Sequence, residues 1–237
     1  MVHINKETCI GCKLCIPYCT MNAILVKNDE VVINQQECVE CQVCLRAQVC
    51  PTDALYTQEL EQARKIREIS NPTIRKLTGI PGRGTEEVKT NDVTGRIKQG
   101  EIGLCIDVGR PNIGTTIKDV ETIAMALAQV GLIFEEQNPC TALMKDSTTG
   151  EFNSHVKKQK VLSIIIEGKS TIENIPSIIS ALKIVEKQVN TVFSVGLICR
   201  VGENNRIPVL PILEELGIPV RPNGKTNVGL GKPLIVT

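Results

Sequence analysis

The sequence predicts an α+β protein in which a small Cys-rich module precedes a larger, duplicated domain. Eight of its 11 Cys lie within the first fifty residues, and this part of the chain repeats itself. A second pattern of strand, loop and helix occurs twice after residue 100. Charge divides at the same places, because the net charge is −2 over residues 1–56, +3 over 57–100 and zero over 101–237. We therefore expect a Cys-rich domain, a helix with a basic connector, and a duplicated α+β domain over these three ranges.

The repeat in the first domain has a step of 29 residues. Val2–Asn5 leads to Cys9 as Val31–Asn34 leads to Cys38. After Cys44 the second half gains two residues. Each half is predicted to form a short strand, a Cys loop, a short helix and a returning strand.

The connector begins with a helical pattern from Thr57 to Ser70. Acidic side chains lie early in it and basic ones late, which suits the helix dipole, and Asn71-Pro72 ends it. Residues 71–100 combine Gly, Pro and charge without periodicity, and predict an extended connector that wraps a surface. The connector is basic and the first domain is acidic, so we expect the connector to clamp that domain or to grip a partner.

Two βαβ-like units side by side are predicted in the larger domain, with the helices on one face of the sheet. The apolar positions 117, 120, 124 and 127 form one face of the first helix. The expected elements, in order, are strand Glu101–Val108, helix Thr116–Val130, strand Leu132–Glu135, strand Lys160–Glu167, helix Thr171–Val189, strand Thr191–Arg200 and helix Val209–Leu216. A Gly-rich tail follows.

The N-terminal cysteines form two runs of one kind. They are Cys9, Cys12, Cys15 and Cys19, followed by Cys38, Cys41, Cys44 and Cys50. Thiolates bind iron–sulfur clusters, and in a C-x2-C-x2-C-x3-C-P run the first three hold one cluster while the fourth serves the other cluster. Residues 1–56 therefore resemble the bacterial-type ferredoxin with two [4Fe–4S] clusters. The resemblance implies cluster I on Cys9, Cys12, Cys15 and Cys50, and cluster II on Cys38, Cys41, Cys44 and Cys19.

Two departures from the ferredoxin pattern concern the fourth cysteines. Thr20 replaces the usual Pro after Cys19, and five residues rather than three separate Cys44 from Cys50. Neither removes a thiolate, so eight ligands are still expected. A zinc site uses paired Cys, so it would leave the third Cys of each run without a role. Disulfides form in an oxidising compartment, and the N-terminus shows no export pattern that would direct the chain to one. The expected fold is thus a dicluster ferredoxin domain followed by a tandem βαβ-type domain, ferredoxin-like or ACT-like.

We expect the remaining Cys and His residues to have structural roles. Cys105 and Cys199 lie in apolar strand-like runs, where a buried Cys is a common core residue. Cys140 follows a Pro turn and is the one that could be exposed. His3 and His155 are expected to be solvated or hydrogen-bonded rather than to act as ligands.

Two Arg-Pro-Asn loops leave a choice between a turn and a binding loop. Gly109–Thr116 contains Arg110 and joins a strand to a helix, where backbone amides suit an anion. Arg221–Asn227 has a similar composition near the C-terminus. Both are either structural turns or loops for a cofactor, substrate or partner, and neither matches a Walker A loop or a dinucleotide fingerprint.

The stretch Gly82–Arg96, together with the Gly109–Gly114 loop, resembles 6-hydroxynicotinate reductase-like proteins. That resemblance implies a ferredoxin-dependent reduction of a nitrogen heteroaromatic ring. It assigns no catalytic residue in this chain.

Composition narrows the remaining function classes. A net charge of +1 and an aromatic content of 2% give no reason to expect nucleic acid as a partner, and no apolar run is long enough for a membrane span. The leading hypothesis is an electron-transfer subunit of an anaerobic, ferredoxin-linked oxidoreductase complex in the cytoplasm, with a redox protein or a larger oxidoreductase subunit as its partner. The alternatives are a self-contained reductase with a flavin or substrate site in the larger domain, although no motif supports a flavin, and a redox or ligand sensor.

Overall fold

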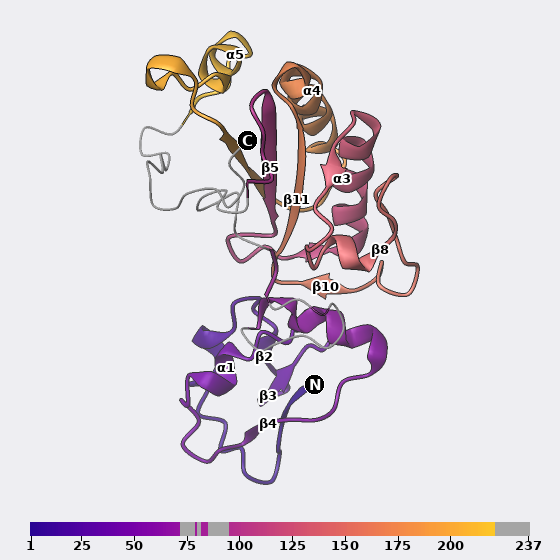
Figure 1. Cartoon of the computed structure of the whole chain (residues 1–237). Helices are drawn as coiled ribbons and strands as arrows, with labels where there is room; N and C mark the ends of the chain where they lie inside the picture. The colour runs from indigo at the N-terminus through magenta and orange to yellow at the C-terminus, as the bar shows by residue number, and fades with distance from the viewer. Residues whose placement is uncertain (72–78, 80–81, 85–94, 221–237) are drawn as a thin grey trace.

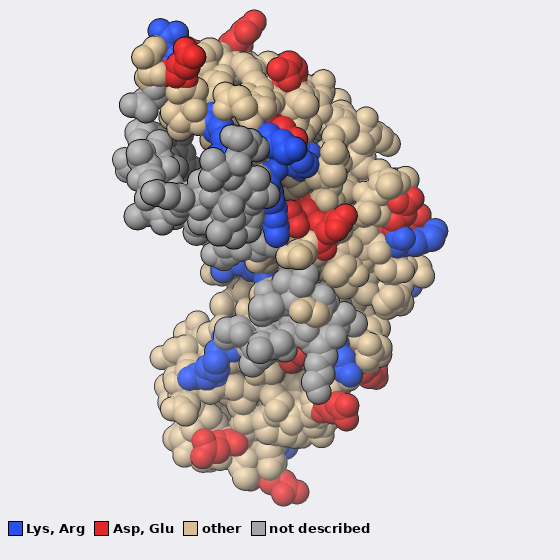
Figure 2. Space-filling model, in the orientation of Figure 1, with Lys and Arg blue, Asp and Glu red and all other residues tan. Residues whose placement is uncertain are grey.

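The computed structural model of the chain describes residues 1–71, 79, 82–84 and 95–220, and it has two lobes (Figure 1). The Arg221–Asn227 loop, the Gly-rich tail and most of the connector lie outside the described residues. Figure 2 shows basic and acidic side chains interspersed on the visible face of both lobes, as the near-zero net charge leads one to expect. Within the described residues, no helix has the length and hydropathy needed to cross a membrane.

The N-terminal lobe consists of the two predicted half-repeats, interlocked. Its elements are β1 (Val2–Ile4), η1 (Ile16–Tyr18), β2 (Ile24–Lys27), β3 (Glu30–Ile33), α1 (Val43–Arg46) and β4 (Leu55–Thr57). β1 pairs antiparallel with β4, and β2 pairs antiparallel with β3. β1 and β2 belong to the first half, and β3 and β4 belong to the second. Each of the two sheets therefore pairs a strand of one half with a strand of the other.

The larger lobe contains a four-stranded antiparallel sheet in the order β12-β5-β11-β7. Its main elements are β5 (Glu101–Val108), α3 (Ile117–Gln129), β7 (Ile133–Phe134), β11 (Ile164–Thr171), α4 (Ile175–Val185) and β12 (Phe193–Cys199). The two expected units interleave, because β11 lies between β5 and β7 while β5 lies between β11 and β12. This is the β-α-β-β-α-β order of a split βαβ arrangement.

Shorter elements complete the larger lobe. They are β6 (Thr115–Thr116) paired with β10 (Lys160–Val161), β8 (Met144–Asp146) paired with β9 (Glu151–Phe152), η3 (Thr141–Leu143), η4 (Ile172–Asn174), η5 (Glu203–Asn205) and α5 (Val209–Glu215).

The core of the larger lobe lies between the sheet and α3 and α4, which are side by side on one face (Figure 1). Alternate residues of β5, such as Leu104 and Ile106, are fully buried in this core. The four predicted apolar positions of α3, at 117, 120, 124 and 127, are also fully buried. The period of the sequence therefore gave the correct buried face of this helix.

The described part of the connector packs on the opposite face of the sheet. Arg83 forms an ion pair with Asp107 of β5 at 2.6 Å, and its carbonyl accepts a hydrogen bond from the Ile165 amide. A Cβ on Gly103 would lie 3.1 Å from Ile97 Cδ1, so Ile97 lies directly against the strand. At these positions the connector wraps a surface, as predicted.

Three sequence predictions of element boundaries were wrong. The helix expected over Thr171–Val189 is divided into η4 and α4, it ends at Val185, and Thr171 belongs to β11. The helix expected from Thr57 begins only at Gln62, as the 3-10 helix η2 (Gln62–Ser70), because Thr57 pairs with Val2 in the sheet. The strand expected over Lys160–Glu167 is split: its first two residues form β10, and β11 runs from Ile164 to Thr171.

The expected strand ended at Glu167 because the next residue is Gly168, and a glycine commonly marks the end of a strand. It lies inside the strand, opposite Leu104 on one side and Phe134 on the other. A Cβ at this position would lie 2.6 Å from the Ile133 carbonyl oxygen. The glycine therefore permits the close approach of β7 and does not end the strand.

Candidate metal centres

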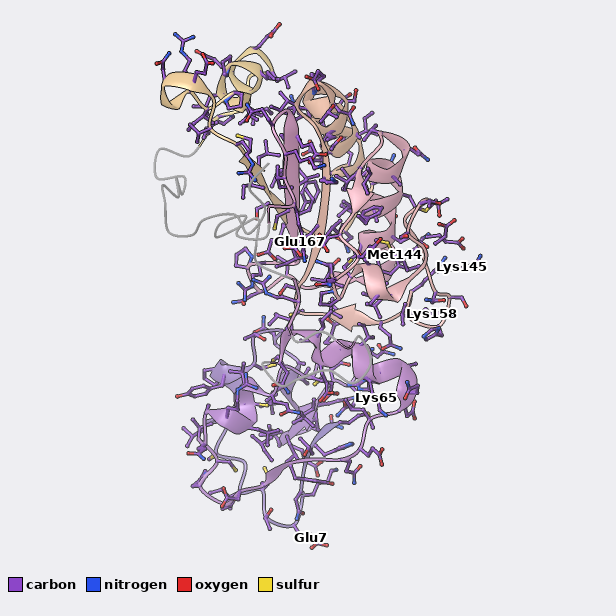
Figure 3. The ribbon with its side chains drawn as sticks, viewed as in Figure 1. Glu7, Lys65, Met144, Lys145, Lys158 and Glu167 are labelled. Atoms are coloured by element: carbon purple, nitrogen blue, oxygen red, sulfur yellow. The ribbon has the colours of Figure 1, made fainter. Side chains whose placement is uncertain are left out.

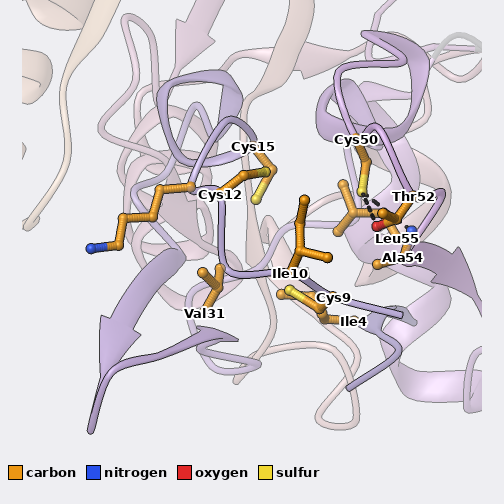
Figure 4. Close-up of a pocket in the computed structure, with 11 residues that line it drawn as sticks. Ile4, Cys9, Ile10, Cys12, Cys15, Val31, Cys50, Thr52, Ala54 and Leu55 are labelled. Carbon is orange, nitrogen blue, oxygen red and sulfur yellow. Dashed lines mark hydrogen bonds between the residues drawn. The ribbon is translucent and has the colours of Figure 1, made fainter. Parts of the chain in front are cut away.

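The first pocket of the N-terminal lobe collects four cysteines from both halves of the repeat. Cys9, Cys12 and Cys15 come from the loop between β1 and η1, and Cys50 comes from the segment between α1 and β4 (Figure 4). Ile4, Val31, Ala54 and other side chains complete an apolar lining. We call this pocket site I.

A second pocket collects the other four. Cys38, Cys41 and Cys44 come from the loop between β3 and α1 and from α1 itself, and Cys19 follows η1. We call this pocket site II. The structure thus gathers the two sets of four that the ferredoxin resemblance implies, each with three cysteines from one run and the fourth from the other.

The two fourth cysteines have matching surroundings. The Ala23 amide donates to Cys19 Sγ at 3.1 Å, and the Ala54 amide donates to Cys50 Sγ at 3.2 Å, in both cases from four residues further along the chain. Thr52 Oγ1 lies 3.7 Å from Cys50 Sγ (Figure 4). The two extra residues before Cys50 therefore do not disturb its local geometry.

The thiols differ in how readily they ionise. Burial raises the pKa of Cys38 to about 11 and that of Cys44 to about 12, and neighbouring thiols of site II add to both shifts. Burial also raises the pKa of Cys15. At Cys50 burial acts in the same direction, but hydrogen bonds from Thr52 and Ala54 outweigh it and lower the pKa. Cys15, Cys38 and Cys44 therefore need the positive charge of bound metal to be held as thiolates at neutral pH.

The donor set fits a cluster better than a single ion. Within the described residues, no group of three or more His, Cys, Asp or Glu side chains is placed to hold one metal ion. The eight cysteines line two pockets and do not converge on a point. Four thiols spread around a space are what a cube-shaped iron–sulfur group requires.

The other Cys and His residues lie outside both pockets. Cys105 is buried in β5, as predicted, and Cys199 is half-buried at the end of β12. The suggestion that Cys140 is exposed was wrong: it is fully buried in the core, where its amide donates to Asn138 Oδ1. His3 stacks on Tyr56, the residue opposite it in β4.

A buried charge network beside site II was not predicted residue by residue. Glu40, between two cysteines of site II, accepts hydrogen bonds from the Val2 amide and from Arg64 Nε. Arg67 Nη1 donates to the carbonyls of Gln35, Gln36 and Cys38. Both arginines belong to η2, so the basic segment does clamp the acidic lobe, which is one of the two outcomes expected from the charge pattern.

The Gly109–Thr116 loop is a structural turn at a lobe junction. The first three amides of α3 are occupied: those of Ile117 and Lys118 donate to backbone carbonyls, and that of Asp119 donates to Thr116 Oγ1. Arg110 is exposed, and a Cβ on Gly114 would lie 2.6 Å from Met21 Cε. This use of the amides removes the argument for an anion at the helix start. The companion loop at Arg221 lies outside the described residues.

A comparison with known families finds a match over the segment that contains the first run of cysteines. Residues 2–25 match the family model of the 4Fe-4S binding domain. No curated protein and no solved structure matches the chain. The N-terminal segment is therefore of the ferredoxin type, which supports 4Fe-4S cluster binding and a role in electron transfer.

Proposed function

We propose that the chain binds two [4Fe–4S] clusters, cluster I on Cys9, Cys12, Cys15 and Cys50 and cluster II on Cys19, Cys38, Cys41 and Cys44. The observation that supports this most directly is the composition of the two pockets, each of which draws cysteines from both halves of the repeat. Each cluster, when bound, accepts and releases one electron. The chain's own contribution is to hold the thiolates, to donate amide hydrogen bonds to sulfur and to exclude part of the solvent.

At the level of the cell, we propose an electron-transfer subunit of an anaerobic, ferredoxin-linked oxidoreductase complex in the cytoplasm. The loop of site I begins after Glu7, which lies at the end of the molecule away from the larger lobe (Figure 3). In this loop Cys12 is exposed and Ile10 is 67% exposed. Site II lies beside the larger lobe, because Met21 of its lining lies against Gly114 and Arg67 of η2 bonds both the Cys38 carbonyl and Gln159. The larger lobe would then dock the chain to a catalytic subunit, and the resemblance to 6-hydroxynicotinate reductase-like proteins suggests reduction of a nitrogen heteroaromatic ring as one such reaction.

The number of clusters can be measured on anoxically purified and reconstituted protein. We expect about eight iron and eight sulfide per chain. Four irons or fewer after full reconstitution would contradict two clusters.

Crossed ligation can be tested by pairing serine variants. Cys19→Ser should lose about half of the iron. Adding Cys38→Ser should then remove little more, because both residues serve the same cluster, whereas adding Cys9→Ser should remove most of what remains. Iron counts with the opposite order would show that each run holds its own cluster.

The subunit role requires a partner. Anoxic purification from the native host, followed by mass spectrometry of the eluted complex, should identify a larger oxidoreductase chain in a fixed ratio. A native preparation that is monomeric and turns over a substrate alone would contradict the subunit role.

A further inference from the structure

Arg67 links site II to the larger lobe. Its side chain is only 8% exposed. On one side Nη1 donates to the Cys38 carbonyl at 2.8 Å and to the carbonyls of Gln35 and Gln36 at 3.0 Å. On the other side Nε donates to Gln159 Oε1 of the larger lobe at 2.8 Å. One guanidinium therefore touches both the cysteine loop and the domain behind it.

In the described part of the chain, Arg67 forms no direct ion pair, although the carboxylates of Glu40 and Glu37 act on its charge from further away. Arg64 lies 2.6 Å from Glu40, and Lys160 pairs with Glu37, so these four charges form two ion pairs. Among the described residues, the hydrogen bonds of Arg67 go to neutral carbonyl and amide oxygens. A guanidinium remains charged even when buried. Site II thus has a fixed positive charge, carried by η2, against the segment that leads to Cys38.

None of the described residues that line site I is an arginine. Its lining includes Lys13, which is exposed, and its Cys12 is open to water. Water supports the charge of a reduced cluster there. At site II the thiols are further from solvent, which by itself makes an added electron less favourable, and a nearby positive charge acts in the opposite direction.

We propose that Arg67 is a positioning residue that raises the reduction potential of the centre in site II and fixes that centre against the larger lobe. This inference rests on the proposed function, since it needs a cluster on Cys19, Cys38, Cys41 and Cys44. It adds to that function a difference between the two sites in the factors that set their reduction potentials. Site I is open to water at Cys12, whereas at site II, where all four cysteines are partly buried, a buried charge favours reduction.

A redox titration that resolves the two clusters by their spectra tests the proposal. Arg67→Gln should lower the potential of the site II cluster by about 59 mV, a tenfold change in its reduced-to-oxidised ratio, and leave cluster I unchanged. Arg67→Lys, which keeps the charge, should retain most of the potential. Lys65→Gln is the matched control, because it removes one positive charge from the same helix (Figure 3), and no hydrogen bond or ion pair joins its side chain to the described cysteine loop.

Gln159→Glu provides a second test that leaves every contact of Arg67 with the cysteine loop in place. The new carboxylate would lie against the guanidinium and offset its charge, so the site II potential should fall in the same direction. Gln188→Glu adds the same charge at an exposed position after α4 and should have no such effect. An unchanged site II potential in a Gln159→Glu protein with both clusters bound, or equal shifts at both clusters, would overturn the inference. Fewer than two clusters in the unmodified chain would instead contradict the proposed function.

Discussion

Glu121 shows how a single buried carboxylate is accommodated in the larger lobe. It lies on α3, is 1% exposed, and accepts a hydrogen bond from the Phe152 amide at 2.9 Å. Lys157 Nζ lies 2.7 Å away and Lys118 Nζ 2.9 Å away. Burial opposes ionisation, but these donors outweigh it and lower the pKa of Glu121 to about 2. The carboxylate thereby joins α3 to β9.

Glu121→Gln should destabilise the protein by about 2–3 kcal/mol at pH 7, because charge-assisted hydrogen bonds are lost. The pKa of Glu121 is lower in the folded chain than in the unfolded chain, so its contribution is complete above about pH 4.5 and is lost as pH falls toward 2. Urea unfolding of both proteins between pH 7 and pH 2.5 measures the difference, in which acid damage common to both cancels. Glu136→Gln, at an exposed position, is the control. A difference that stays constant down to pH 2.5 would contradict the assignment.

At the scale of the element, two glycines in the same sheet differ in whether their surroundings leave room for a side chain. A Cβ on Gly168 in β11 would lie 2.6 Å from the backbone oxygen of Ile133, whereas a Cβ on Gly196 in β12 would meet nothing closer than 3.8 Å. Backbone cannot yield as a flexible side chain can. Only Gly168 is therefore required by the packing of its neighbours.

We expect Gly168→Ala to destabilise the larger lobe by about 2 kcal/mol or more, by forcing β7 away from β11. Gly196→Ala should be neutral or stabilising by up to about 1 kcal/mol, because it reduces the entropy of the unfolded chain. Chemical denaturation followed by circular dichroism measures both. Equal effects of the two substitutions would show that β7 adjusts without cost.

The same contrast explains which elements the sequence could predict. The four apolar positions of α3 follow from helical period alone. The three closely spaced cysteines of each run follow from their spacing, and the fourth cysteine of each set follows from the resemblance to bacterial-type ferredoxins. Gly168 was read as the end of a strand because its role depends on β7, which is distant in sequence. The contacts of Arg67 depend on carbonyls oriented by turns of the cysteine loop, where Glu40 and Gln42 have left-handed backbones. No local pattern encodes such acceptors.

At the scale of the whole molecule, η2 belongs to both lobes. Ile66 and Ile69 are buried in the hydrophobic core of the larger lobe, while Arg64 and Arg67 bond the cysteine loop. Ser70 Oγ donates to the Ser163 carbonyl and accepts from the Ser163 amide. A helix with one face in a core and the other on a metal-binding loop couples the stability of the two. We therefore expect loss of the core contact to destabilise the cysteine loop of site II as well.

Ile69→Ala should destabilise the larger lobe by about 2–5 kcal/mol, since it leaves a cavity in a closed core. Because η2 also holds the site II loop, loss of the cluster absorbance on heating should move to lower temperature together with the loss of helical circular dichroism. Ile184→Ala, on α4 where the side chain is 60% exposed, removes the same atoms and should change both transitions little. Anoxic thermal scans that record absorbance and circular dichroism on one sample provide the measurement. If Ile69→Ala lowered only the circular dichroism transition, the lobes would unfold independently and η2 would not couple them.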